Sequence, residues 1–168
     1  MWSMHIQIPE EMSNNKDIHA LSFYECYPDK SYIEVDDRRS VIVLKEKGER
    51  RKYQANNNSH EQVIVYRIDG GVIRKDSELK CDYALLTESN TLYLVELKGA
   101  DYDHAVRQIL NTIKLLKPDV KTLNARVVLS KVKTPNILST DEKQLTRILR
   151  QRKGTLQRAV NILVENIS

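Results

Sequence analysis

The clearest pattern along the chain is a pair of β-rich runs, 82–87 and 91–98, on either side of the polar Glu88-Ser89-Asn90. Two such runs around a short polar segment predict a β-hairpin. If Thr87 and Thr91 close the loop, the numbers of directly paired residues sum to 178. This register determines which side chains lie opposite one another.

In that register Asp82 lies directly opposite Glu96. Because side chains alternate along a strand, both carboxylates share a face with Leu92, Leu94 and Lys98. Two carboxylates and an ammonium group then lie at one end of an apolar face. Charges in such a place are costly unless a cation or a chemical task uses them.

The pattern upstream of this hairpin predicts further antiparallel strands. Residues 63–66 form an apolar strand, 69–71 a turn, and 72–73 the start of a return strand. A second hairpin is predicted over 40–55, with a charged return strand, and a short strand over 32–35. The middle of the chain is therefore expected to be an antiparallel meander.

Helical periodicity begins after the hairpin. Residues 101–117 predict an amphipathic helix that Asp101 or Asp103 caps and Pro118 ends, with Gln108 at the edge of its buried stripe. A strand over 125–129 follows, and the intervening helix favours a parallel pairing. Two more helices are predicted, over 139–153 and 156–167. The first has a capping box formed by Ser139 and Glu142, and Gly154 fits a C-terminal cap.

These elements predict a mixed α/β (α+β) fold in a single domain spanning 1–168. Its core is an antiparallel meander followed by a helix and a parallel strand, over about 61–130. Residues 1–60 form a β-rich N-terminal extension that includes an edge strand at 6–8 and a short helix within 17–27. Basic helices occupy 139–168.

Composition is that of an ordinary globular chain, with 40% hydrophobic and 30% charged residues. We find no apolar run long enough to span a bilayer and no signal-peptide pattern, which predicts a cytoplasmic protein without a membrane partner. Cys26 and Cys81 have no metal-ligand spacing and favour a reducing compartment, a disulfide between them being the less favoured alternative.

The net charge of +4 is unevenly distributed. Residues 1–99 hold 14 Lys/Arg and 17 Asp/Glu, a net −3, whereas residues 100–168 hold 13 and 6, a net +7. An acidic cluster beside a basic segment suits a metal-dependent enzyme that acts on a polyanion. Solvated helix faces that happen to be basic are an equally good interpretation of charge alone.

The order of elements and the motif Asp82, thirteen residues, then Glu96-Leu97-Lys98 resemble the PD-(D/E)xK nuclease superfamily, which includes restriction endonucleases and Holliday-junction resolvases. Gln108 resembles the glutamine that some members carry in the following helix, but the tyrosine of the Gln-x-x-x-Tyr variant is replaced by Thr112. The resemblance covers roughly 61–130 and implies a restriction-endonuclease-like core. It also implies a possible homodimer.

In this interpretation Asp82 and Glu96 bind Mg²⁺ (or Mn²⁺), and the Leu97 backbone carbonyl adds a ligand. Lys98 orients or deprotonates the attacking water, and its pKa is lowered near the metal. Gln108 completes the catalytic set. The structural alternative is a surface ion-pair ladder of Asp82, Lys98 and Glu96. This alternative is disfavoured because Leu92 and Leu94 on the same strand face predict that the face packs against a core.

Some members of that superfamily carry an additional upstream acid. Glu61 is the first candidate for this metal ligand, and Glu34 and Asp37 are poorer ones. A solvated strand-end residue is an equally good interpretation of Glu61. The long upstream helix that usually bears this acid is missing from the sequence pattern.

Basic side chains are candidates for contacts to nucleic-acid phosphates, which position a substrate without reading its sequence. They are Lys131, Lys133, Arg147, Arg150, Arg152, Lys153 and Arg158. His104 is a further candidate, although a plain surface role is favoured. Tyr93 and Tyr102 can stack on bases, but core or rim packing is the better interpretation.

The function expected from the sequence is a Mg²⁺-dependent nuclease that hydrolyses phosphodiester bonds, with DNA as the expected nucleic-acid partner. The alternative is a catalytically inactive subunit of the same fold that binds nucleic acid or assembles with a protein partner. A third option is a protein-interaction module whose basic helices bind an acidic partner.

Overall fold

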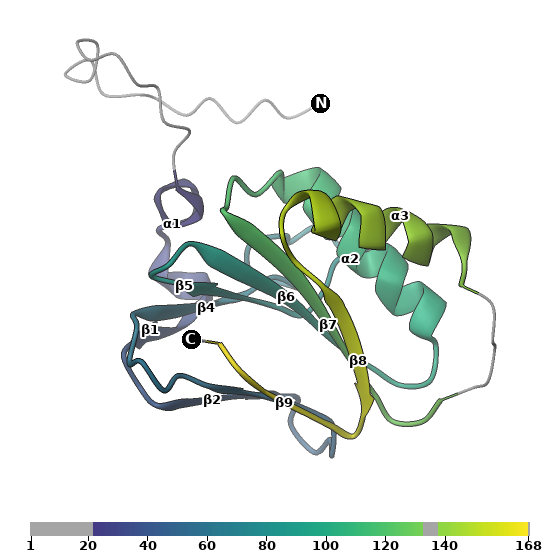
Figure 1. Cartoon of the computed structure of the whole chain (residues 1–168), viewed down its shortest axis with the longest axis horizontal. Helices are drawn as coiled ribbons and strands as arrows, with labels where there is room; N and C mark the ends of the chain where they lie inside the picture. Colours follow the sequence, from purple (N-terminus) through teal and green to yellow (C-terminus); the bar gives the residue numbers. More distant parts are fainter. Residues whose placement is uncertain (1–21, 133–137, 168) are drawn as a thin grey trace, which may run out of the picture.

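The computed structural model describes residues 22–132 and 138–167 and has a mixed α/β fold of two sheets and a helical layer (Figure 1). The predicted strand at 6–8 lies outside the described residues, as does the first part of the predicted helix within 17–27. The described part of that helix contains α1 (Phe23–Cys26), which Ser22 caps through a bond from Glu25 N–H.

The larger sheet has six strands in the order β1-β4-β5-β6-β7-β8. The pairs from β1 to β6 are antiparallel, and β6, β7 and β8 run parallel to one another. The predicted antiparallel meander is confirmed for β4, β5 and β6, whereas the hairpin predicted over 40–55 belongs to a second sheet. The predicted parallel strand after the helix is confirmed. The strands are β1 (Ile33–Asp37), β4 (Val63–Arg67), β5 (Tyr83–Thr87), β6 (Thr91–Lys98), β7 (Thr122–Leu129) and β8 (Leu156–Val160).

The β5–β6 hairpin has the predicted register, because Tyr83 pairs with Val95 and Leu86 with Leu92. Its loop is closed as expected, since Thr91 N–H donates to Thr87 Oγ1 at 3.3 Å. The predicted return strand at 72–73 is wrong. The chain turns tightly there, and β5 itself supplies the antiparallel partner of β4.

Two helices cover one face of the six-stranded sheet (Figure 1). The predicted helix over 101–117 is confirmed as α2 (Tyr102–Leu116), whose N-cap Asp101 accepts a bond from His104 N–H at 2.9 Å. Ser139 caps α3 (Thr140–Gln151) by accepting from Glu142 N–H at 3.1 Å. No helix within 22–132 and 138–167 has the length and apolar character needed to cross a membrane.

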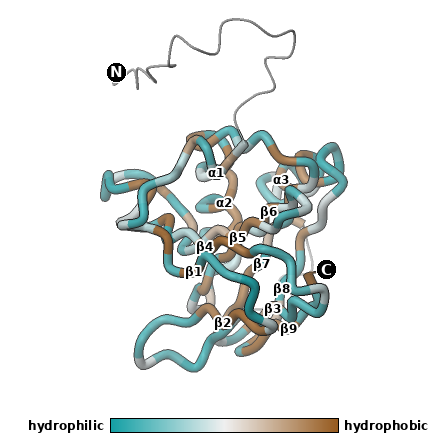
Figure 2. Tube along the Cα trace, turned by 90° about the vertical axis from the view of Figure 1, so that its left-hand side faces the viewer, coloured by the Kyte–Doolittle hydropathy of each residue, from teal (hydrophilic) through white to brown (hydrophobic). Residues whose placement is uncertain are grey.

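The second sheet covers the opposite face and has three strands in the order β2-β3-β9. The predicted hairpin over 40–55 is confirmed as β2 (Val41–Lys45) and β3 (Lys52–Asn56), and β9 (Ile162–Asn166) runs parallel to β3. Apolar stretches gather along the central strands, whereas outlying loops are hydrophilic (Figure 2).

The predicted C-terminal helix over 156–167 is wrong, because this segment forms β8 and β9. Asn161 adopts φ 64° between them, where the chain passes from one sheet to the other. Its N–H donates to Leu129 O at 2.7 Å, and its carbonyl accepts from Lys52 N–H at 2.9 Å. The edge strands of both sheets thus provide hydrogen-bond partners for the backbone of this segment. This strand pairing outweighs the helical preference that the sequence periodicity indicates.

A buried polar network lies between the two sheets. Arg126 of β7 contacts Glu165 of β9 through Nε–Oε1 at 2.6 Å and Nη2–Oε2 at 2.9 Å. Tyr53 of β3 also donates its hydroxyl to Glu165 at 2.8 Å. The guanidinium lies 5.3 Å from the centre of the Tyr93 ring, so Tyr93 has a packing role. This network ties the second sheet to the first.

Candidate metal centre

Asp82 lies immediately before β5, where its backbone carbonyl accepts from Ile68 N–H at 2.9 Å. Its side chain reaches across to the neighbouring strand, and Oδ2 accepts from Leu97 N–H at 2.8 Å. The carboxylate therefore lies against the Glu96-Leu97-Lys98 segment of β6. The hairpin register brings the sequence motif together as predicted.

The same hydrogen bond orients the Leu97 carbonyl. In a strand, the N–H and C=O of one residue point to the same side. Because the N–H of Leu97 points toward Asp82, its carbonyl also points to that side, away from β7. A backbone oxygen is thus available beside the Asp82 carboxylate.

Glu96 is buried, with only 2% of its surface exposed, and its Oε2 has no hydrogen-bond partner. It lies on the face of β6 that Leu92 and Leu94 pack against α2. Burial, followed by the nearby Asp82 carboxylate, raises the pKa of Glu96 to about 9. A buried oxygen without a partner is the kind of group that a bound cation satisfies.

The pKa of Asp82 is raised to about 6, chiefly by burial. The Leu97 N–H bond lowers it, Glu46 and Asp69 raise it further, and Lys98 opposes them. Two adjacent carboxyl groups with raised pKa values form a site that favours protons or cations.

Gln108 of α2 lies where the sequence placed it, at the boundary between helix and sheet. Its Nε2 donates to the Lys80 carbonyl at 2.9 Å, while its Oε1 is buried without a partner. Its amide also has a small lowering effect on the pKa of Glu96. Two unpartnered buried oxygens, from Glu96 and Gln108, therefore belong to one site.

Lys98 ends β6 and is half-buried on the same face. Its charge lowers the pKa of Asp82, of Glu96 and of His104. The pKa of His104 is lowered first by burial and then by the charge of Lys98.

Sequence reasoning missed Glu46 and Asp69, the two further acids whose charges reach Asp82. Glu46 follows β2 and accepts the Tyr83 hydroxyl at 2.8 Å; Asp69 lies 3.4 Å from Lys80 Nζ. The position of Asp69 could have been predicted from the pairing of β4 with β5, because this pairing brings the residues after β4 beside Asp82. Glu46 depends on how the second sheet packs, for which the sequence carries no local signal.

The structure does not bring Glu61 to this site. Val63 pairs with Thr87, so Glu61 lies at the loop end of the hairpin, where Oε2 accepts from Ser89 N–H at 3.2 Å. Asp82 lies opposite Ile68, seven residues along the chain from Glu61, which corresponds to roughly 23 Å of extended strand. The antiparallel direction of β4 therefore corrects the Glu61 prediction.

The two poorer candidates for the upstream acid are also engaged elsewhere. Glu34 accepts from Arg67 Nε at 2.7 Å, and Asp37 accepts from Arg39 Nε at 2.8 Å. In the described part of the chain, no group of three or more His, Cys, Asp or Glu side chains is arranged to hold a metal ion. The donors at hand are Asp82, Glu96 and the Leu97 carbonyl, which suits a Mg²⁺ that retains several waters.

The predicted phosphate contacts are dispersed. Lys131 follows β7 at the same end as the site, where Ser130 N–H donates to Gly99 O at 2.7 Å. Arg152 donates to Pro118 O at 2.6 Å and to Val120 O at 3.1 Å, so its role is structural. It and Lys153 lie where β8 begins, at the end of the sheet opposite Lys98.

Arg147 and Arg150 are exposed on α3, and Lys133 lies outside the described residues. Arg158 of β8 stacks over the Tyr102 ring, with its guanidinium carbon 4.7 Å from the ring centre. Tyr102 also donates its hydroxyl to Glu142 at 2.9 Å and so joins α2 to α3.

Comparison of the chain with protein-family models, with curated proteins and with solved structures finds no match.

Proposed function

We propose that this protein is a metal-dependent nuclease that hydrolyses phosphodiester bonds in DNA, built on a restriction-endonuclease-like core. The observation that carries the proposal is the buried Glu96 carboxylate, whose Oε2 lacks a partner beside Asp82. Leaving a carboxylate buried without a partner costs several kcal/mol or forces it to take up a proton. A divalent cation removes that cost.

The identity of the reaction rests on the residues around the pair. Asp82 and Glu96-Leu97-Lys98 lie on an antiparallel hairpin that a helix and a parallel strand follow, the order that the PD-(D/E)xK resemblance implies. The net charge of +7 over residues 100–168 favours a polyanionic substrate.

Each residue of the site then has a role in phosphodiester hydrolysis. Asp82, Glu96 and the Leu97 carbonyl hold Mg²⁺, which when bound supplies positive charge at the transition state and a polarised water. Lys98 orients the attacking water on the face it shares with the two carboxylates. The water oxygen would bond to phosphorus and release a proton, the bond from phosphorus to the leaving oxygen would break, and that oxygen would take up a proton, so that protons balance overall.

Cleavage assays test this proposal. Purified protein is incubated with linear, nicked, branched and single-stranded DNA, and with RNA, in Mg²⁺ or Mn²⁺. We expect metal-dependent cleavage that Glu96→Ala and Lys98→Ala each reduce by about 10²–10³-fold. Glu88→Ala removes an exposed carboxylate at the loop end of the same hairpin and serves as the matched control. Cleavage that persists unchanged in both site variants contradicts the proposal.

A second candidate is a non-catalytic subunit that binds nucleic acid. The engagement of Glu46 by Tyr83 and of Asp69 by Lys80 favours it, because both extra acids near Asp82 already have partners. Salt-dependent DNA binding without metal-stimulated cleavage of any substrate would favour this candidate over the nuclease.

A further inference from the structure

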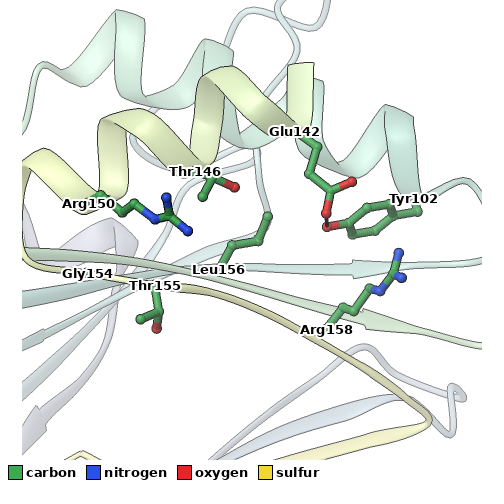
Figure 3. A pocket seen from close by; sticks show the side chains of 8 residues that line it. All are labelled: Tyr102, Glu142, Thr146, Arg150, Gly154, Thr155, Leu156 and Arg158. Atoms are coloured by element: carbon green, nitrogen blue, oxygen red, sulfur yellow. Dashed lines mark hydrogen bonds between the residues drawn. The ribbon is translucent and has the colours of Figure 1, made fainter. Parts of the chain in front are cut away.

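A second polar hollow lies between α3 and the edge strand β8 (Figure 3). It has a volume of about 310 Å³, in the lower range for ligand sites, and is lined in part by Thr146, Thr155, Arg150 and Arg158. Figure 3 shows the two arginines at its two ends, with Thr146 and Leu156 between them. A volume of this size is about that of one nucleotide unit of a nucleic-acid strand.

The turn from α3 into β8 builds this hollow. A Cβ at Gly154 would lie 1.7 Å from Leu123 O, so only glycine permits this close approach to β7. Gly154 N–H donates to Leu149 O at 2.8 Å, and Lys153 takes the left-handed conformation, φ 56°. The last turn of α3 is thereby held above the first residues of β8.

The charges in the hollow favour an anion. Neither the Arg150 nor the Arg158 guanidinium makes a hydrogen bond or ion pair within the described residues, and that of Arg158 stacks on the Tyr102 ring. The one carboxylate there, Glu142, already accepts the Tyr102 hydroxyl. The two guanidinium groups and the Thr146 hydroxyl are donors of the kind that bind phosphate, whereas the Thr155 hydroxyl already donates to Asn124 Oδ1 at 3.3 Å.

The sheet register links this hollow to the candidate metal centre. Glu96 pairs with Val127, and Val127 pairs with Arg158, so the three residues form one row across the sheet. Residues in register on parallel strands share a face, and two strand spacings place the backbones of Glu96 and Arg158 roughly 10 Å apart. Arg158 thus lies on the same helix-covered face as the metal centre.

An adjoining hollow lies beside the loop that leads from the end of β6 into α2. It also has a volume of about 310 Å³ and shares Tyr102 and Arg158 as lining residues. Its other lining residues include Ala100 and two acids, Asp101 and Asp103, of which Asp101 caps α2 by accepting from His104 N–H at 2.9 Å. The two hollows form a path from the end of β6 to Arg150.

We propose that Arg158 and Arg150 bind consecutive backbone phosphates of a single nucleic-acid strand next to the phosphate that is cleaved. The strand passes from Lys98 across Tyr102 and along the groove between α3 and β8. These contacts are to phosphate and therefore independent of base sequence. The inference deepens the proposed nuclease function and rests on it.

Binding assays in a Glu96→Gln background, which removes cleavage, test the groove. The probe is a fluorescent single-stranded oligonucleotide, and its affinity is measured by anisotropy over a range of salt concentrations. We expect Arg158→Gln and Arg150→Gln each to weaken binding about tenfold. Each also reduces the slope of log K against log salt by about 0.7, the value for one phosphate contact on a single strand.

Lys143→Gln is the matched control, because Lys143 is an exposed basic residue of the same helix and is not among the lining residues of the groove. It should change the affinity less than twofold. Equal effects of Lys143→Gln and Arg150→Gln would indicate non-specific surface charge and overturn the proposal. If Arg158→Gln does not fold, Arg150→Gln carries the test alone, because its side chain is exposed on α3.

A second experiment uses inorganic phosphate as the probe. If millimolar phosphate raises the melting temperature through Arg158 while oligonucleotide binding is unchanged in both variants, the hollow is a small-anion site and the proposal is wrong. Failure of the nuclease proposal has a different signature. The wild type then cleaves nothing, while both arginine variants still bind the oligonucleotide more weakly. If the wild type cleaves DNA but both arginine variants bind the oligonucleotide normally, the proposed phosphate contacts in the groove are wrong while the nuclease proposal stands.

Discussion

Glu165 and Glu96 are two largely buried carboxylates on opposite faces of the six-stranded sheet, and their surroundings differ. Glu165 receives both arms of the Arg126 guanidinium and the Tyr53 hydroxyl. Glu96 lies under α2 beside a second carboxylate, and its Oε2 has no partner.

This difference in hydrogen-bond and charge partners distinguishes a buried carboxylate with a structural role from one with a functional role. A buried carboxylate with a bidentate arginine is compensated within the fold, and its task is to hold the two sheets together. A buried carboxylate beside another acid is left uncompensated, so its charge is available to a cation. Burial alone does not distinguish the two cases; the completeness of the partner set does.

The largest expected effect comes from breaking the compensated pair. Arg126→Met leaves Glu165 buried without its arginine and should lower the free energy of unfolding by about 3–5 kcal/mol. Urea denaturation followed by circular dichroism measures this loss. The double variant Arg126→Met/Glu165→Met should recover most of it, and a single-variant loss below about 1 kcal/mol would contradict the comparison.

The uncompensated pair predicts a pH dependence of stability in metal-free protein. The pKa of Glu96 is raised from 4.5 to about 9, so its favourable contribution is complete below pH 4.5 and is lost as the pH rises toward 9. The free energy of unfolding in EDTA should therefore fall by on the order of a few kcal/mol over this range. Asp82 contributes the same sign between its ordinary value and pH 6.

Glu96→Gln should flatten that pH profile, because glutamine does not ionise. Arg126→Met should lower the profile and steepen its fall, because Glu165 then becomes a second carboxylate without a compensating charge, whereas Arg126→Met/Glu165→Met should leave the slope unchanged. A wild-type profile that rises between pH 5 and 9 would show that Glu96 is compensated by groups outside this interpretation.

Mg²⁺ should reverse the cost of the uncompensated pair. At a free Mg²⁺ concentration ten times its Kd, the wild type should gain about 1.4 kcal/mol of stability. Thermal melts with and without metal measure the shift. Asp82→Asn and Glu96→Gln should each abolish it, while Arg126→Met should retain it; equal shifts in all four proteins would mean that the metal binds elsewhere.

The smallest effect concerns Gln108, whose Nε2 satisfies the Lys80 carbonyl. Gln108→Leu should cost about 1 kcal/mol of stability and, by disturbing the surroundings of Glu96, reduce cleavage by roughly tenfold. Asn111→Leu is the matched control, since Asn111 on the same helix donates to the Leu79 carbonyl at 2.7 Å. It should cost similar stability and leave cleavage unchanged.

Much of the candidate site followed from local sequence patterns. Alternation and a short polar loop predicted the β5–β6 register, and with it the meeting of Asp82 and Glu96. Helical periodicity predicted α2 and the place of Gln108. These features depend on neighbours within about thirty residues, so the pattern of the chain contains the required information.

Long-range pairing decided the rest. The segment 156–167 became two strands because β7 and β3 offered edges to pair with, and this pairing placed Arg158 in the row of Glu96. The antiparallel direction of β4 removed Glu61 from the site, while packing of the second sheet brought Glu46 to Asp82. The sequence by itself determined the pair of acids and the faces of their strands. The tertiary structure alone decided which other charges surround them, because those charges come from chain segments that meet only when the sheets assemble.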